Sequence, residues 1–185
     1  MKLIVITLFC CAAALSGPAR AREVSGVSVP AMASVADKEL TLNGAGVRKE
    51  KAFFNVYVVA LYLEQPTSDA RAAITSDQEK HIVLSMLRAV SREQFVEALE
   101  TGIARNSSGV MPILRERLDL LQKALPPLEK GDVLTFTYLP GSGTVLCGQG
   151  QEMKIPGKDF ADALLSAWLG LAPVSGDLKR QLLGG

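Results

Sequence analysis

The chain has 185 residues, 48% of them hydrophobic, and a formal net charge of +1. A chain of this length can bury a core of ordinary size without disulfides or a structural metal. Its near-neutral charge excludes the strongly basic surface that nucleic-acid binding requires, so we expect no nucleic-acid partner.

The beginning of the chain has the pattern of a secretory signal peptide. Met1 and Lys2 precede an apolar run that ends at Leu15, and small residues then form a cleavage site that ends at Ala21. A membrane-spanning helix needs about 20 apolar residues, so this run is short for a permanent anchor. We predict a signal peptide over residues 1–21, cleavage after Ala21, and a periplasmic or secreted protein with no stable membrane anchor. A retained anchor is the alternative.

Removal of residues 1–21 changes the charge and the cysteine content. The remainder has 18 basic and 19 acidic residues, a net charge of −1, and Cys147 as its single cysteine. No internal disulfide can then form, and the apolar strand pattern around Cys147 predicts a buried, unreactive thiol. The single histidine, His81, has no cysteine or carboxylate at metal-ligand spacing, which predicts no metal site. Gly44 and Gly46 lack the third glycine of a dinucleotide loop, and we expect no cofactor.

The first elements of the remaining chain are predicted to be strands. Residues 22–37 are small and polar, which predicts a loose lead-in or an edge strand. Lys38–Gly44 alternates in polarity and opens the sheet. After a short charged turn, Val56–Leu63 is apolar without alternation, so this strand should be covered on both faces.

Helices and further strands follow this hairpin. A helical turn is expected over Ala70–Ile74 and a strand over Lys80–Leu87. Ser91 and Gln94 have the spacing of a capping box. The helix that they begin carries an apolar stripe formed by Phe95, Leu99 and Ile103. Asn106–Gly109 ends that helix, and a second one begins near Pro112 with Leu114, Leu118 and Leu121.

The last third of the chain predicts a hairpin and two helices. Val133–Leu139 and Thr144–Gly148 are joined by a four-residue turn rich in glycine, which is a strong hairpin pattern. Gln151–Ile155 can add a short strand, and helices follow at Lys158–Leu169 and Ser175–Leu183. Because strands and helices are grouped, we predict an α+β fold in which helices cover one side of an antiparallel sheet.

Two stretches carry a family resemblance. The steps Gly44 to Arg48 and Tyr62 to Glu64 resemble the opening hairpin of the chalcone isomerase family. The closing segment from Phe160 to Leu183, which includes Trp168, is similar to the C-terminal helices of that family. The resemblance implies an open-faced β-sandwich, with a large antiparallel sheet and helices packed on one side. It implies a chalcone isomerase-like domain over residues 38–185, as in a bacterial exported member of the family.

The resemblance also bears on catalysis. The enzymes of the family close a ring by holding an anionic oxygen with an arginine, while hydroxyl and ammonium donors stabilise the developing enolate. Arg48 falls on the family arginine. At the other positions the residues that the enzymes use as donors are replaced. The residues in this chain are Tyr57, Ser91, Gln94, Ala98 and Ala161. We therefore predict no catalytic residue, and keep an isomerase (intramolecular lyase) with an unknown substrate as the alternative.

Arg48 and Tyr57 resemble instead the fatty-acid-binding branch of the same fold. A guanidinium and a phenol can together satisfy a carboxylate at the end of an apolar slot. We therefore predict Arg48 and Tyr57 as ligand-binding residues, and a small amphipathic anion such as a fatty acid as the ligand. The acyl tail would lie between the sheet and the helices that carry Phe95, Leu99, Leu118 and Trp168.

The spacing of the two residues raises a geometric difficulty. If Lys49 and Glu50 formed a two-residue turn, Arg48 would pair with Lys51 and lie on the order of 20 Å from Tyr57. A longer loop or a bulge would bring them together. The alternatives are a surface Arg48 paired with Glu50 or another acid, and a core role for Tyr57. A structural or interaction module whose slot has closed remains a third class of function.

Overall fold

The computed structural model describes residues 21–51 and 53–185. The predicted signal peptide lies, except for Ala21, outside the described residues, so it stays a prediction. Within the described part of the chain, no helix is both long and apolar enough to span a bilayer.

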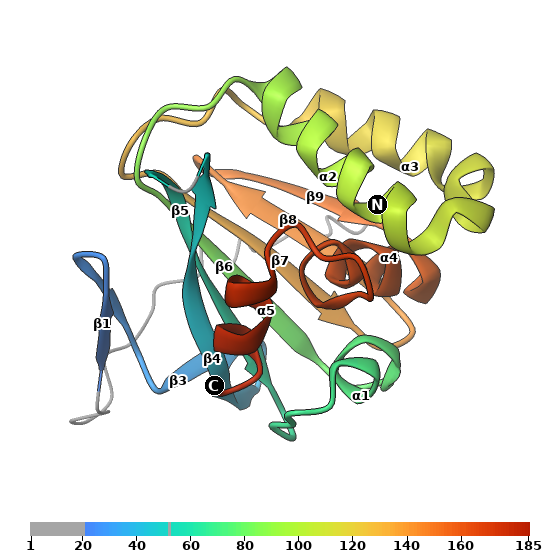
Figure 1. The fold of residues 1–185 in the computed structure, drawn as a ribbon. Helices are drawn as coiled ribbons and strands as arrows, with labels where there is room; N and C mark the ends of the chain where they lie inside the picture. The colour runs from blue at the N-terminus through green and yellow to red at the C-terminus, as the bar shows by residue number, and fades with distance from the viewer. Residues whose placement is uncertain (1–20, 52) are drawn as a thin grey trace, which may run out of the picture.

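The centre of the fold is a seven-stranded antiparallel sheet in the order β3-β4-β5-β6-β7-β8-β9 (Figure 1). Each strand pairs with its neighbour in sequence, so the sheet is a continuous meander. The predicted α+β class with an antiparallel sheet is confirmed. The strands are β3 (Met32–Val35), β4 (Lys38–Glu50), β5 (Phe54–Leu63), β6 (Lys80–Met86), β7 (Val133–Leu139), β8 (Gly143–Gly148) and β9 (Gln151–Ile155).

All five described α-helices add side chains to one core on one face of the sheet, as predicted (Figure 1). A 3-10 turn, Ser108–Val110, separates the second helix from the third. The Ser91–Gln94 capping box is present at the start of α2, which confirms that prediction. The helices are α1 (Ala70–Thr75), α2 (Arg92–Ser107), α3 (Met111–Ala124), α4 (Lys158–Leu169) and α5 (Gly176–Leu182).

Residues 22–37 form short strands. β1 (Arg22–Val24) and β2 (Val27–Val29) pair as a hairpin, and β3 is the edge strand of the large sheet. Valines of the hairpin pack with Val58, Ala60 and Tyr62 on the face opposite the helices. β5 is therefore covered on both sides, because its alternate residues Leu61 and Leu63 join the helix-side core.

The two glycines of the family-like motif allow α5 to contact β4. A Cβ on Gly44 would overlap the Gln181 carbonyl oxygen, and one on Gly46 would overlap the Gln181 side chain. Asn43 fixes the contact, since its amide nitrogen donates to the Leu182 carbonyl oxygen at 2.7 Å. The glycines thus have a packing role, and α5 lies directly beside the strand that carries Arg48.

The predicted burial of Cys147 is wrong, because its side chain is exposed. Along β8, Thr144 and Leu146 are buried, whereas Cys147 lies on the alternate side of the strand. Side chains alternate between the faces of a sheet. Cys147 therefore belongs to the face that the helices leave uncovered.

Candidate ligand cavity

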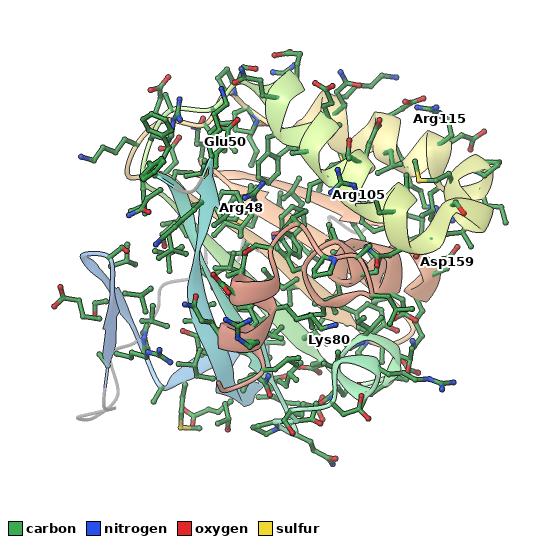
Figure 2. The ribbon with its side chains drawn as sticks, viewed as in Figure 1. Arg48, Glu50, Lys80, Arg105, Arg115 and Asp159 are labelled. Carbon is green, nitrogen blue, oxygen red and sulfur yellow. The ribbon has the colours of Figure 1, made fainter. Side chains whose placement is uncertain are left out.

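A cavity of about 400 Å³ lies between the β4–β5 hairpin and α2. Its walls combine charged, polar and apolar side chains from the sheet, from α2 and from the C-terminal segment. Figure 2 shows Arg48 on the strand side and Arg105 on the helix side. The lining residues include Arg48, Glu50, Tyr57, Arg88, Gln94, Phe95, Glu97, Ala98, Leu99, Thr101, Arg105, Trp168 and Val174.

The structure brings Arg48 and Tyr57 together. They are direct partners across β4 and β5, and both line the cavity. The two-residue turn that would have separated them by on the order of 20 Å is not formed, and the longer loop and the bulge are both present. The connection runs from Lys51 to Phe53 rather than over Lys49 and Glu50, and a register shift lies between Arg48 and Lys49. A bulge of this kind changes the partner of every residue beyond it.

Arg48 is half-buried and contacts the carbonyl oxygen of Lys49. The carboxylate of Glu50 lies 3.9 Å from Arg88 instead, so Glu50 is not the partner of Arg48. No carboxylate within the described residues pairs with Arg48. The reading of Arg48 as a surface charge neutralised by Glu50 is therefore wrong.

Tyr57 is buried, and its hydroxyl oxygen accepts a hydrogen bond from a neighbouring side chain. The indole nitrogen of Trp168 donates to the Tyr57 hydroxyl oxygen at 3.3 Å, and the ring of Phe95 meets the Tyr57 ring edge-on at 6.2 Å. Burial raises the pKa of Tyr57, against smaller opposite effects of Trp168 and Arg48, so the phenol stays neutral at ordinary pH. Its own O–H is free to donate, because the Trp168 contact uses only a lone pair.

Sequence reasoning missed Thr101 and Arg105. Together with Gln94 and Ala98 they form one face of α2, at spacings of four, three and four residues. This face lies beside the predicted apolar stripe, so the helical spacing was a signal that could have identified it. Arg105 has no carboxylate partner among the residues described.

The apolar walls agree only in part with the predicted tail position. Phe95, Leu99 and Trp168 line the cavity, and Val174 of the C-terminal segment joins them. Leu118 does not line it, because this residue is fully buried in the core between α3 and the sheet. A tail in this cavity would therefore contact α2 and α4 rather than α3.

His81 lies away from this cavity. Its Nδ1 is 2.8 Å from the Thr137 hydroxyl oxygen, and burial lowers the pKa of His81 to about 4. In the described part of the chain, no group of three or more histidine, cysteine or acidic residues is placed to hold a metal ion.

The fold and cavity define a class of proteins, the open-faced β-sandwiches with a cavity between sheet and helices. The family model described as chalcone isomerase-like matches residues 21–184. The chain belongs to the chalcone isomerase-like family. A search of curated proteins gave no match.

The fold is similar to that of a solved structure over most of both chains. This is the crystal structure of a fatty-acid binding protein of Arabidopsis thaliana, with a TM-score of 0.64 and 17% sequence identity. The match covers 85% of this chain and 92% of that chain. At this identity the likeness establishes the fold.

Proposed function

We propose that this chain is a non-catalytic binding protein for a small amphipathic carboxylate such as a fatty acid. The observation that carries the proposal is the pairing of Arg48 with Tyr57 at the wall of a cavity. The guanidinium N–H groups of Arg48 and the O–H of Tyr57 donate to no carboxylate or carbonyl across the cavity among the described residues. A carboxylate held between them would receive charge-assisted hydrogen bonds, which are about twice as strong as neutral ones.

The charge around the cavity favours an anion. Arg48 and Arg105 lie on opposite walls, and neither is neutralised by a described carboxylate. Glu50 lines the same cavity, but its closest cation is Arg88. Glu97 is exposed on α2 and offsets one positive charge. The excess of positive charge lowers the cost of moving a carboxylate out of water.

The apolar walls and the volume suit the rest of such a ligand. Phe95, Leu99, Trp168 and Val174 supply the surface for a hydrocarbon chain. The volume of about 400 Å³ falls within the range of roughly 300–1,000 Å³ that small-molecule sites occupy. The similar Arabidopsis protein is described as a fatty-acid binding protein, which supports the same ligand class here.

The lining residues favour binding over ring closure. Gln94 and Ala98 line the cavity, where the family enzymes are expected to have lysine and asparagine. An amide and a methyl group replace the ammonium and amide donors that would stabilise an enolate. Export to the periplasm or the exterior is part of the proposal, and its support is the pattern of residues 1–21.

Ligand release tests this function directly. The chain without residues 1–21 is purified, denatured and extracted, and mass spectrometry should find a stoichiometric amphipathic carboxylate. The delipidated protein is then titrated with dodecanoate and with dodecanol. The carboxylate should bind at least tenfold more tightly, because the alcohol cannot use the charge of Arg48. No released ligand and no dodecanoate binding would refute the proposal, whereas turnover of a chalcone would support the isomerase.

A further inference from the structure

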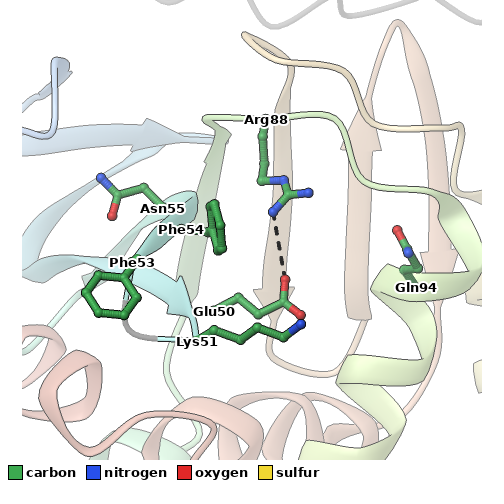
Figure 3. Close-up of a pocket in the computed structure, with 7 residues that line it drawn as sticks. All are labelled: Glu50, Lys51, Phe53, Phe54, Asn55, Arg88 and Gln94. Atoms are coloured by element: carbon green, nitrogen blue, oxygen red, sulfur yellow. Dashed lines mark ion pairs between the residues drawn. The ribbon is translucent and has the colours of Figure 1, made fainter.

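The tip of the β4–β5 hairpin exposes two aromatic side chains. Phe53 is 87% exposed and Phe54 is 55% exposed. Hairpin turns are normally polar, since Gly, Asn, Asp, Ser and Pro provide their geometry. Exposing two adjacent phenylalanine rings to water is unfavourable, and the fold does not need them at this position. Figure 3 shows both rings on the tip, with Arg88 on the facing loop.

The tip adjoins the ligand cavity. An open hollow of about 600 Å³ is lined by Glu50, Lys51, Phe53, Phe54, Asn55, Arg88 and Gln94. Three of these residues, Glu50, Arg88 and Gln94, also line the ligand cavity. The hollow and the cavity are therefore neighbours that share a wall, so whatever covers the tip also covers an approach to the cavity.

The charges around the two rings are mainly positive. Lys49 and Lys51 are exposed on the hairpin itself, and Arg88 places its guanidinium 5.9 Å from the centre of the Phe54 ring. The hairpin has one carboxylate at this point, Glu50, and it lies 3.9 Å from Arg88. Aromatic rings flanked by lysine and arginine are the composition of segments that lie in the interface of an anionic bilayer.

We propose that this tip docks on the surface of an anionic lipid bilayer. Phe53 and Phe54 enter the boundary between headgroups and acyl chains, while Lys49, Lys51 and Arg88 contact the headgroup phosphates. The docked protein presents the hollow, and the ligand cavity behind it, to the lipid surface. This inference goes beyond the proposed function, because docking does not depend on which ligand the cavity holds.

Vesicle sedimentation tests the docking. The chain without residues 1–21, which retains every described helix and strand, is mixed with vesicles of phosphatidylcholine with and without phosphatidylglycerol. Binding should require phosphatidylglycerol and decrease at high salt. Phe53→Ser with Phe54→Ser should weaken it at least tenfold. Lys49→Gln with Lys51→Gln should weaken it by about fivefold for each charge removed.

A matched pair of exposed apolar residues provides the control. Ile113 and Leu120 on α3 are 66% and 42% exposed, and their joint replacement by serine should leave vesicle binding unchanged. Circular dichroism and the thermal midpoint show whether each variant is folded. Equal vesicle binding by the wild type and the folded Phe53→Ser, Phe54→Ser variant would overturn the proposal. So would a tip-dependent dimer or protein complex without vesicle binding.

The docking proposal and the ligand proposal can be refuted independently of each other. Arg48→Ala should bind vesicles as the wild type does, because Arg48 lies inside the cavity rather than on the tip. The Phe53→Ser, Phe54→Ser variant should still bind dodecanoate added from solution. A wild-type chain that binds vesicles but not dodecanoate would refute the proposed function alone, and one that binds dodecanoate but not vesicles would refute the docking alone.

Discussion

The two ends of the interface between sheet and helices differ in how their cationic side chains are held (Figure 2). At one end Lys80 is 1% exposed, and its ammonium group donates to the Ile74 carbonyl oxygen, lies 3.7 Å from Asp162 and lies 5.5 Å from the Tyr138 ring centre. At the other end the half-buried Arg48 and the exposed Arg105 line a cavity, and neither has a described carboxylate partner. Charge at the first end is satisfied within the protein, whereas the guanidinium groups at the second end remain accessible from the cavity.

This difference separates a structural cluster from a candidate binding site. Burial lowers the pKa of Lys80 to about 8, although Asp162 acts in the opposite direction. A perturbed pKa by itself would mark Lys80 as the functional residue. Lys80 lines neither the ligand cavity nor the hollow beside it, and its ammonium group already has partners within the protein, so geometry assigns it to the fold. Unused donors beside a cavity are the better indicator of a site in this molecule.

Loss of the Lys80 side chain should give the largest effect. Lys80→Ala removes a buried stem together with the hydrogen bond to Ile74, and should lower the free energy of unfolding by about 3 kcal/mol. Lys80→Met retains the stem, and Asp162 keeps Lys158 at 2.6 Å, so its loss should be about 1 kcal/mol or less. Urea unfolding measures both. Dodecanoate affinity of the folded variants should not change, and a weakened affinity would break the distinction between the two ends.

Arg48→Ala should show the opposite pattern. Dodecanoate affinity should fall by about 2 kcal/mol, or roughly 30-fold, because a charge-assisted contact is lost. The free energy of unfolding should change by less than about 0.5 kcal/mol, since Arg48 has no carboxylate partner among the described residues. Isothermal titration calorimetry and urea unfolding measure the two effects. Arg115→Ala, at an exposed position on α3, is the matched control, and equal affinities of the two variants would exclude Arg48 as an anchor.

Tyr57→Phe should have a smaller effect, a loss of about 1 kcal/mol in dodecanoate affinity, because one neutral donor disappears. Trp168→Phe removes the indole donor that orients the Tyr57 hydroxyl group. The double variant should lose less than the sum of the single losses, since both changes act through the same hydroxyl group. Strict additivity in the titrations would show that Trp168 does not position Tyr57.

The elements of this fold were predictable because their patterns are local. The Ser91–Gln94 capping box, the apolar stripe on α2 and the turn before β8 are each defined within a few residues. The cavity depends on long-range geometry that such patterns do not contain. One bulge next to Lys49 decides that Arg48 faces Tyr57, and the sequence was compatible with both arrangements.

The same limit explains the individual errors. An apolar neighbourhood predicted burial for Cys147, but which face of β8 the helices cover depends on the whole sheet. Leu118 and Leu99 have the same helical periodicity, yet only Leu99 reaches the cavity. The sequence could not single out Arg105 on its face of α2, because only the folded chain shows that no described carboxylate pairs with it.

The smallest expected effect is on the pH dependence of the free energy of unfolding. Lys80 has a folded pKa of about 8 against its ordinary value of 10.5, so the unfolded state holds more protons between these values. Stability from this residue therefore rises with pH in that window. From pH 7.5 to 8.5 the wild type should gain about 0.7 kcal/mol relative to Lys80→Met. The range stays below pH 10, where the raised pKa values of Tyr57 and Tyr62 reverse the slope. Parallel pH profiles in urea unfolding would mean that the Lys80 ammonium is not desolvated, and the contrast with Arg48 would then rest on hydrogen bonding alone.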